Sequence, residues 1–150
     1  MNTKMKIAQC FLAMVLLCKT CKFPNEGSFF ILTNNANHSI NHYIEGMYPD
    51  TLIVKDKPHL MITQSMTSSK DFDWGTWKER FRELKNDTLS VFIFHTDTLN
   101  KYTWDEVRDG YMILKRYDLS FDDIHRLDFI SYPPDETMKD VKMFPPFGSE

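Results

Sequence analysis

The sequence predicts an α+β fold, a mixed or antiparallel β-sheet with short helices packed on it. The main observation is the stretch from Thr88 to Tyr132, which has the pattern strand, short helix, strand, short helix, strand. Composition favours a single domain with its own core, because the 150 residues are 42% hydrophobic and 14% aromatic. We expect residues 28–150 to form this single α+β domain.

The segments before Thr88 hold further strands. Four strand-like runs are separated by turn-forming residues, at positions 28–32, 38–44, 51–54 and 59–64. Asn34 to Asn37 join the first two runs, since asparagine tolerates left-handed turn conformations. Residues 65–71 are predicted to be a polar loop.

A helical period follows in residues 74–84. Trp77, Phe81 and Leu84 recur at the spacing of one helix face, and the positions between them are mostly charged. Asp73 is the expected N-cap of this helix.

The run after Thr88 has the pattern of a central strand. Leu89, Val91 and Ile93 share one face, and Phe92 and Phe94 share the other. A strand that is apolar on both faces is covered on both sides and does not lie at a wet edge.

Capping residues mark the two short helices of this unit. Thr103 is followed three residues later by Glu106, which predicts a capping box, and Gly110 is expected to end that helix in the left-handed conformation. Ser120 is expected to cap the second helix. The remaining predicted segments are strands at 111–117 and 127–132, one or two helical turns at 135–141, and an extended tail at 143–150.

The N-terminal residues have the composition of an export signal. Lys4 and Lys6 precede an apolar run at 7–18, which predicts a signal segment over residues 1–21, followed by a tether at residues 22–27. The alternative is an amphipathic first helix of a cytosolic protein. All three cysteines lie in this segment, so no structural disulfide is expected in the domain.

Six segments of the chain form a distinctive set of motifs, namely Asn34-Asn35, Tyr48-Pro49-Asp50-Thr51, Asp87 to Leu99, Tyr102 to Val107, Ile113 to Ser120 and Tyr132 to Pro134. Together with the N-terminal segment, this set resembles that of a group of small uncharacterised lipoprotein-like exported proteins of Bacteroidota. The resemblance implies export and a lipid anchor, and it carries no activity. Cys21, preceded by the small Thr20, is the expected site of lipid attachment, and Cys18, preceded by Leu17, is the other candidate.

Three residues are candidates for a functional site. His95 and Asp97 directly follow the central strand, and Trp104 lies beside a helix cap. The simpler interpretations are that His95 ends the strand, that Asp97 shapes a turn, and that Trp104 covers the sheet.

Other polar clusters are assigned no site. His38 and His42 are interpreted as surface residues, because residues four apart in a strand lie roughly 13 Å apart. Helix capping accounts for Asp118, Asp122 and Asp123 without a calcium site. No catalytic motif is recognised, and no cofactor or metal is expected.

Two functions follow as hypotheses. The first is a non-enzymatic binding domain of the cell envelope, in the periplasm or at the outer membrane, with a protein or a glycan as partner. The alternative is a small metal-dependent hydrolase that uses His95, Asp97 and one more histidine. The net charge of −3 argues against nucleic acid as a partner, and a membrane is expected as a partner only through the lipid anchor.

Overall fold

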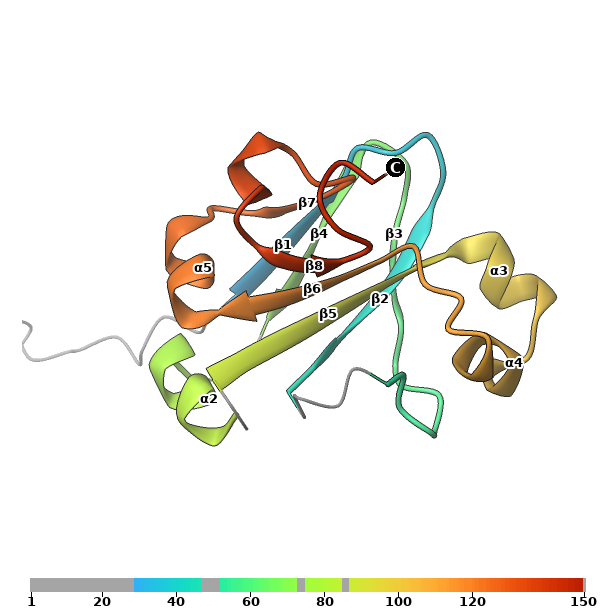
Figure 1. Cartoon of the computed structure of the whole chain (residues 1–150), viewed down its shortest axis with the longest axis horizontal. Helices are drawn as coiled ribbons and strands as arrows, with labels where there is room; N and C mark the ends of the chain where they lie inside the picture. Colours follow the sequence, from blue (N-terminus) through green and yellow to red (C-terminus); the bar gives the residue numbers. More distant parts are fainter. Residues whose placement is uncertain (1–28, 47–51, 73–74, 85–86, 150) are drawn as a thin grey trace, which may run out of the picture.

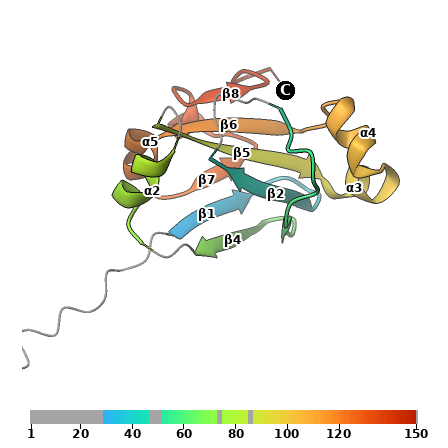
Figure 2. The same ribbon diagram turned by 90° about the horizontal axis from the view of Figure 1, so that it is seen from below.

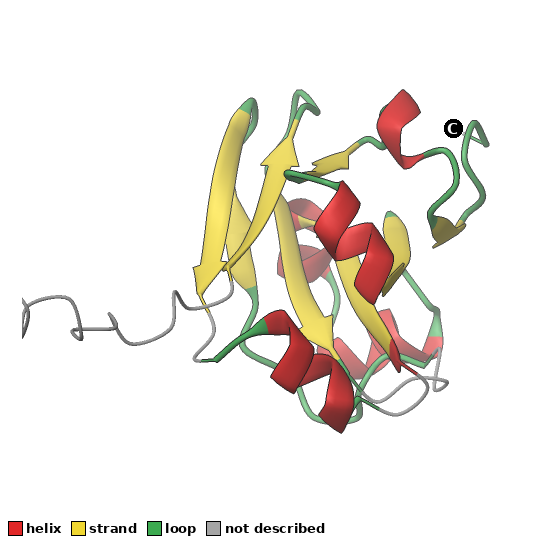
Figure 3. Cartoon of the chain, turned by 90° about the vertical axis from the view of Figure 1, so that its left-hand side faces the viewer, coloured by secondary structure: helices red, strands yellow, loops and turns green. Residues whose placement is uncertain are grey.

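The computed structural model describes residues 29–46, 52–72, 75–84 and 87–149 (Figure 1). The strands of these segments are β1 (Phe29–Asn34), β2 (Ile40–Glu45), β3 (Met61–Thr63), β4 (Thr67–Phe72), β5 (Thr88–His95), β6 (Lys115–Ser120), β7 (Ile130–Tyr132) and β8 (Lys142–Phe144). The helices are α2 (Trp77–Glu83), α3 (Thr96–Lys101), α4 (Trp104–Asp109), α5 (Phe121–Arg126) and the 3₁₀ turn η3 (Glu136–Met138). Figure 3 shows these short helices placed around the strands.

The strands form two sheets. One has the order β4-β1-β7, in which β1 is antiparallel to β4 and parallel to β7. The other has the order β3-β2-β5-β6-β8 and is antiparallel throughout. Figure 2 shows the smaller sheet lying against the larger one. The predicted α+β class is confirmed, with one mixed and one antiparallel sheet.

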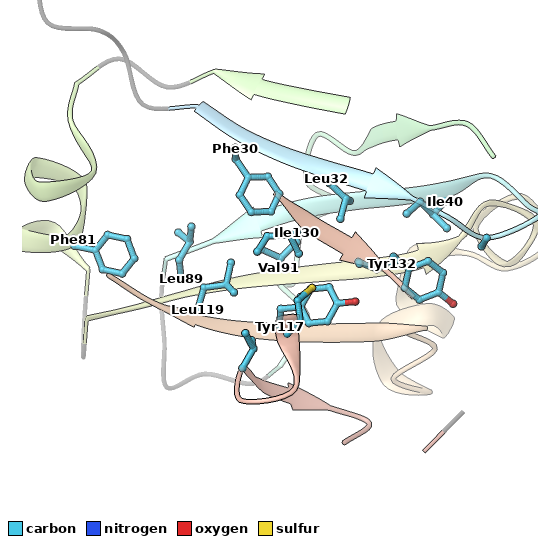
Figure 4. Packing of buried hydrophobic residues seen from close by; sticks show 14 residues of the cluster. Phe30, Leu32, Ile40, Phe81, Leu89, Val91, Tyr117, Leu119, Ile130 and Tyr132 are labelled. Atoms are coloured by element: carbon cyan, nitrogen blue, oxygen red, sulfur yellow. The ribbon is translucent and has the colours of Figure 1, made fainter. Parts of the chain in front are cut away.

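The main core lies between the two sheets (Figure 4). Its side chains come from both inner faces and include Phe30, Leu32, Ile40, Leu89, Val91, Ile93, Tyr117, Leu119, Ile130 and Tyr132. Burial of each large apolar side chain contributes about 1.5–3 kcal/mol to stability.

A second apolar cluster covers the outer face of the larger sheet. Tyr43, Phe92 and Phe94 form its centre, with the Tyr43 and Phe92 rings stacked at 5.0 Å. Residues of α3 and α4 pack on these rings. The predicted central position of β5, covered on both faces, is therefore confirmed.

The first two strands do not form a hairpin, because they belong to different sheets. The fully buried Asn34 organises the crossing between them. Its side-chain nitrogen donates to the carbonyl oxygens of His38, Thr63 and Gln64, and its side-chain oxygen accepts from the Ala36 N–H.

Two predictions about β-structure in the first half of the chain were wrong. The expected polar loop at 65–71 contains β4, an edge strand whose polar composition fits a sheet face open to water. The expected strand at 51–54 is not formed over residues 52–54, although Ile53 is buried.

The helix predicted at 74–84 is confirmed as α2, with a different start. Its N-cap is Thr76, in a capping box with Glu79, and the expected cap Asp73 lies outside the described residues. Phe81 is buried, as its position in the helical period predicts.

Helix α4 begins at the predicted capping box of Thr103 and Glu106. Gly110, however, has φ −81°, and the left-handed residue is Tyr111 with φ 48°. The strand predicted at 111–117 is displaced along the chain, since β6 begins at Lys115 and continues to Ser120.

Two of the three buried charged residues of β6 pair with each other. Arg116 donates two hydrogen bonds to Asp118, at 3.0 and 3.1 Å, and a third to the Tyr111 hydroxyl. Ser90 donates to the same carboxylate. Asp118 therefore belongs to a buried ion pair, and its assignment to helix capping was wrong.

The C-terminal region is more ordered than predicted. The expected helical turns at 135–141 are reduced to η3. The expected extended tail is partly a strand, since β8 pairs antiparallel with β6. Strand β7 is confirmed within 127–132 but is shorter.

Candidate functional site

A pocket of about 410 Å³ opens between the two sheets, on the side where α2 lies. Its walls come from six elements and one connection, and the lining residues are Phe30, Tyr43, Ile44, Glu45, Pro58, His59, Met61, Asp71, Trp77, Arg80 and Leu89. This volume falls within the range of about 300–1,000 Å³ that small-molecule sites occupy.

The pocket has an apolar floor and a polar rim. Phe30, Ile44 and Leu89 belong to or pack on the main core. Charged side chains enter the lining from both sides, among them Asp71 from β4 and Arg80 from α2. The combination of apolar surface and a few polar groups is typical of a ligand site.

Helix α2 carries Trp77 and Arg80 to the pocket. Its start is fixed by the capping box, in which Thr76 accepts from the Glu79 N–H and donates to the Glu79 carboxylate at 3.0 Å. Phe81, one turn later on the same face of the helix, packs in the core, and the Trp77 ring lies edge-on to it at 6.4 Å. The indole of Trp77 is therefore half-buried at the pocket wall.

Asp71 supplies a partly exposed carboxylate to this wall. Among the described residues, none donates a hydrogen bond to it or forms an ion pair with it. The charge of Asp71 acts on the buried ring of His42. His42 lies on β2 next to Tyr43, and its register partner on β3 is Met61. Burial lowers the pKa of His42 to about 4, and Asp71 offsets this only in part by raising the pKa.

The predicted residues His95 and Asp97 lie together at the end of β5, and His38 joins them. The Nδ1 atom of His95 accepts a hydrogen bond from the Asp97 N–H at 3.0 Å, and the Asp97 carboxylate lies 3.9 Å from that atom. The rings of His38 and His95 stack with centroids 4.3 Å apart and planes at 21°. The expected turn at Asp97 was wrong, since His95 is the N-cap of helix α3.

The stacked histidines are poorly arranged to share a metal ion. Their nitrogen lone pairs lie in nearly parallel ring planes and do not converge on one point. In the parts of the chain that the structure describes, no group of three or more His, Cys, Asp or Glu side chains could hold a metal ion.

The interpretation of His38 and His42 as surface residues was wrong for His42, which is fully buried.

Trp104 packs on the second apolar cluster. Its ring lies 5.7 Å from that of Phe94 and 6.3 Å from that of Tyr43, and its indole N–H donates to the Val54 carbonyl oxygen at 3.1 Å. The side chain is half-buried. It thus acts as a cover of the sheet, the simpler of the two interpretations.

The proposed lipid-attachment residue Cys21 lies outside the described residues, as do the signal segment and the tether. None of the helices in the described segments has the length and apolar content of a membrane span.

The pocket itself was missed by sequence reasoning. Trp77 was noticed as part of a helix face, whereas Glu45, Asp71 and Arg80 gave no signal of a shared site because they lie far apart in the chain. No family model, curated protein or solved structure matches the chain, so the candidate site depends on the geometry described above.

Proposed function

We propose that this chain is a non-enzymatic binding domain of the cell envelope that holds a segment of a glycan in the pocket between its two sheets. The observation that carries the proposal is the pocket of about 410 Å³ with an apolar floor and charged rim. The expected signal segment supports the location in the envelope.

A glycan fits the chemistry of this lining. A sugar ring has an apolar C–H face, which packs on an aromatic ring such as that of Trp77, and hydroxyl groups that donate hydrogen bonds. The Asp71 carboxylate has no donor among the described residues and can accept from those hydroxyls. Hydrogen bonds to a charged acceptor are roughly twice as strong as neutral ones.

Binding of soluble oligosaccharides tests the proposal. Isothermal titration calorimetry of the full chain against a panel of α- and β-linked oligosaccharides should find at least one that binds. Asp71→Asn keeps the size of the side chain and removes its charge, so the affinity for that sugar should fall about tenfold. Asp140→Asn, a matched change at an exposed residue outside the pocket, should leave the affinity unchanged.

Two outcomes would contradict the glycan proposal. One is equal affinity of the Asp71→Asn variant and the wild type, which would place the sugar elsewhere. The other is binding to immobilised peptides with no binding to any oligosaccharide, which would make the partner a protein.

A further inference from the structure

Two stacked histidines connect the start of α3 to the segment before β2. The rings of His38 and His95 are 4.3 Å apart. Beside them, the Thr96 N–H donates to the Ser39 carbonyl oxygen at 3.3 Å, and the Thr96 hydroxyl donates to the Asn41 side-chain oxygen at 2.8 Å. These contacts hold the first turn of α3 against the connection between β1 and β2.

The cap of α3 requires an unprotonated nitrogen on His95. Its Nδ1 atom accepts from the Asp97 N–H, which assigns the ring proton to Nε2 in the neutral form. A proton on Nδ1 would convert this acceptor into a donor that faces another donor, and the capping bond would be lost.

The surroundings of His38 disfavour its protonated form. Its Nδ1 atom lies 3.2 Å from the Asn37 side-chain oxygen, which can only accept, so Nδ1 carries the proton. The Nε2 atom is buried and has no hydrogen-bond partner among the described residues, so a second N–H would find no acceptor there. Burial and the neighbouring His95 lower the pKa of His38, and Asp97 acts in the opposite direction.

We infer that His38 and His95 form a pH-sensitive latch, which holds the first turn of α3 in place while both rings are neutral and releases it when they are protonated. The latch is independent of the proposed glycan pocket, because it lies at the His95 end of β5 and the pocket lies at the Leu89 end. Helix α3 also supplies Thr96 and Leu99 to the wall of a second cavity of about 300 Å³.

The charged groups around the two rings act on the protonated latch in opposite directions. Asp97 on α3 would attract a protonated His95, but its side chain is 87% exposed and its field is screened by water. On β6, the buried Lys115 is the register partner of Ile93 and adds a positive charge on the same face of the sheet as His95. From β7, Tyr132 contacts the His38 ring edge-on at 6.2 Å.

The latch is tested by amide hydrogen exchange of the full chain, measured by NMR between about pH 7.5 and pH 5. The titration of the histidine rings is followed in the same samples. Protection of the Asp97 and α3 amides should fall about fivefold as the rings gain protons, which is the equivalent of one N-cap bond. The amides of β5 should keep their protection.

Two variants separate the latch from general effects of acid. His95→Asn supplies a cap that does not titrate, so α3 protection should no longer depend on pH. His125→Asn changes an exposed histidine of α5 and should keep the wild-type response. If His95→Asn does not fold, the wild-type comparison of α3 with β5 decides alone.

The latch would be overturned by constant α3 protection while both rings titrate, or by a pH response in His95→Asn equal to that of the wild type. An equal loss of protection in β5 would also overturn it, since that result means global unfolding and no local release.

Discussion

His42 lies fully buried between the sheets, and neither of its ring nitrogens has a hydrogen-bond partner among the described residues. Burial lowers its pKa from 6.5 to about 4. Between pH 6.5 and about pH 4, the His42 ring binds a proton in the unfolded chain but not in the folded protein. The free energy of unfolding therefore falls as the pH decreases through this range. The stability that the neutral ring provides is therefore present above pH 6.5 and is lost as the pH approaches 4.

We expect His42→Leu to remove most of this pH dependence. The wild type should lose up to about 3 kcal/mol across the interval, measured by urea unfolding at neutral and acidic pH. The variant should keep its stability, except for smaller losses from His38, whose pKa is also lowered by burial, and, close to pH 4, from Glu79 and Glu106, whose pKa values are lowered by their capping hydrogen bonds. His59→Gln, at an exposed histidine, should behave as the wild type does. Equal losses in His42→Leu and the wild type would contradict the assignment.

His95→Ala tests the alternative function of a metal-dependent hydrolase. We expect a loss of about 1 kcal/mol of stability, because the N-cap of α3 is removed, and no change in metal content. Elemental analysis of the purified chain measures the metal. About one transition-metal ion per chain that disappears on substitution would support the hydrolase instead.

At the scale of the element, the short helices depend on their capping boxes. Each of α2, α4 and α5 has six or seven residues and a box whose side-chain and backbone bonds are both formed, at Thr76, Thr103 and Ser120. Helices this short are marginal without packing and caps. The caps therefore decide where each helix begins and how its side chains meet the sheet.

Thr103→Ala and Ser120→Ala should each lower stability by about 1 kcal/mol, or a few degrees in Tm. Thermal unfolding followed by circular dichroism measures the change. Thr103→Ser and Ser120→Thr keep the hydroxyl and should retain nearly wild-type Tm. If the alanine variants matched these conservative variants, the boxes would have no stabilising role.

At the scale of the whole molecule, the proposed lipid attachment concerns residues that precede the described domain. Cys21 and the expected tether at 22–27 precede β1, so a lipid on Cys21 would hold the domain at a membrane surface. Several acyl chains together bind a membrane far more firmly than a single chain does.

We expect the expressed full-length chain to partition into detergent. Cys21→Ser should make it soluble or leave it unprocessed, whereas Cys18→Ser should not, and intact mass of the mature chain measures the modification. An unmodified N-terminus after residue 21 would mean ordinary secretion. A chain that still begins at Met1 in the cytosol would contradict export.

The sequence by itself determined the features that depend on neighbouring residues. The two-sided apolar pattern of β5 placed it at the centre of a sheet, and Thr103 and Ser120 marked the starts of two helices. Such signals are readable because a cap or a strand period involves groups within a few positions of one another.

Only the tertiary structure decided the features that join distant segments. The buried amide of Asn34 directs β1 and β2 into different sheets, and the polar β4 is a strand because β1 supplies its hydrogen-bond partners. The pocket and the pairing of His38 with His95 likewise arise where separate elements meet. The physical reason is that the pairing of strands, the volume of a pocket and the desolvation of a side chain all depend on which groups from distant parts of the chain lie nearby. No local sequence pattern encodes these neighbours.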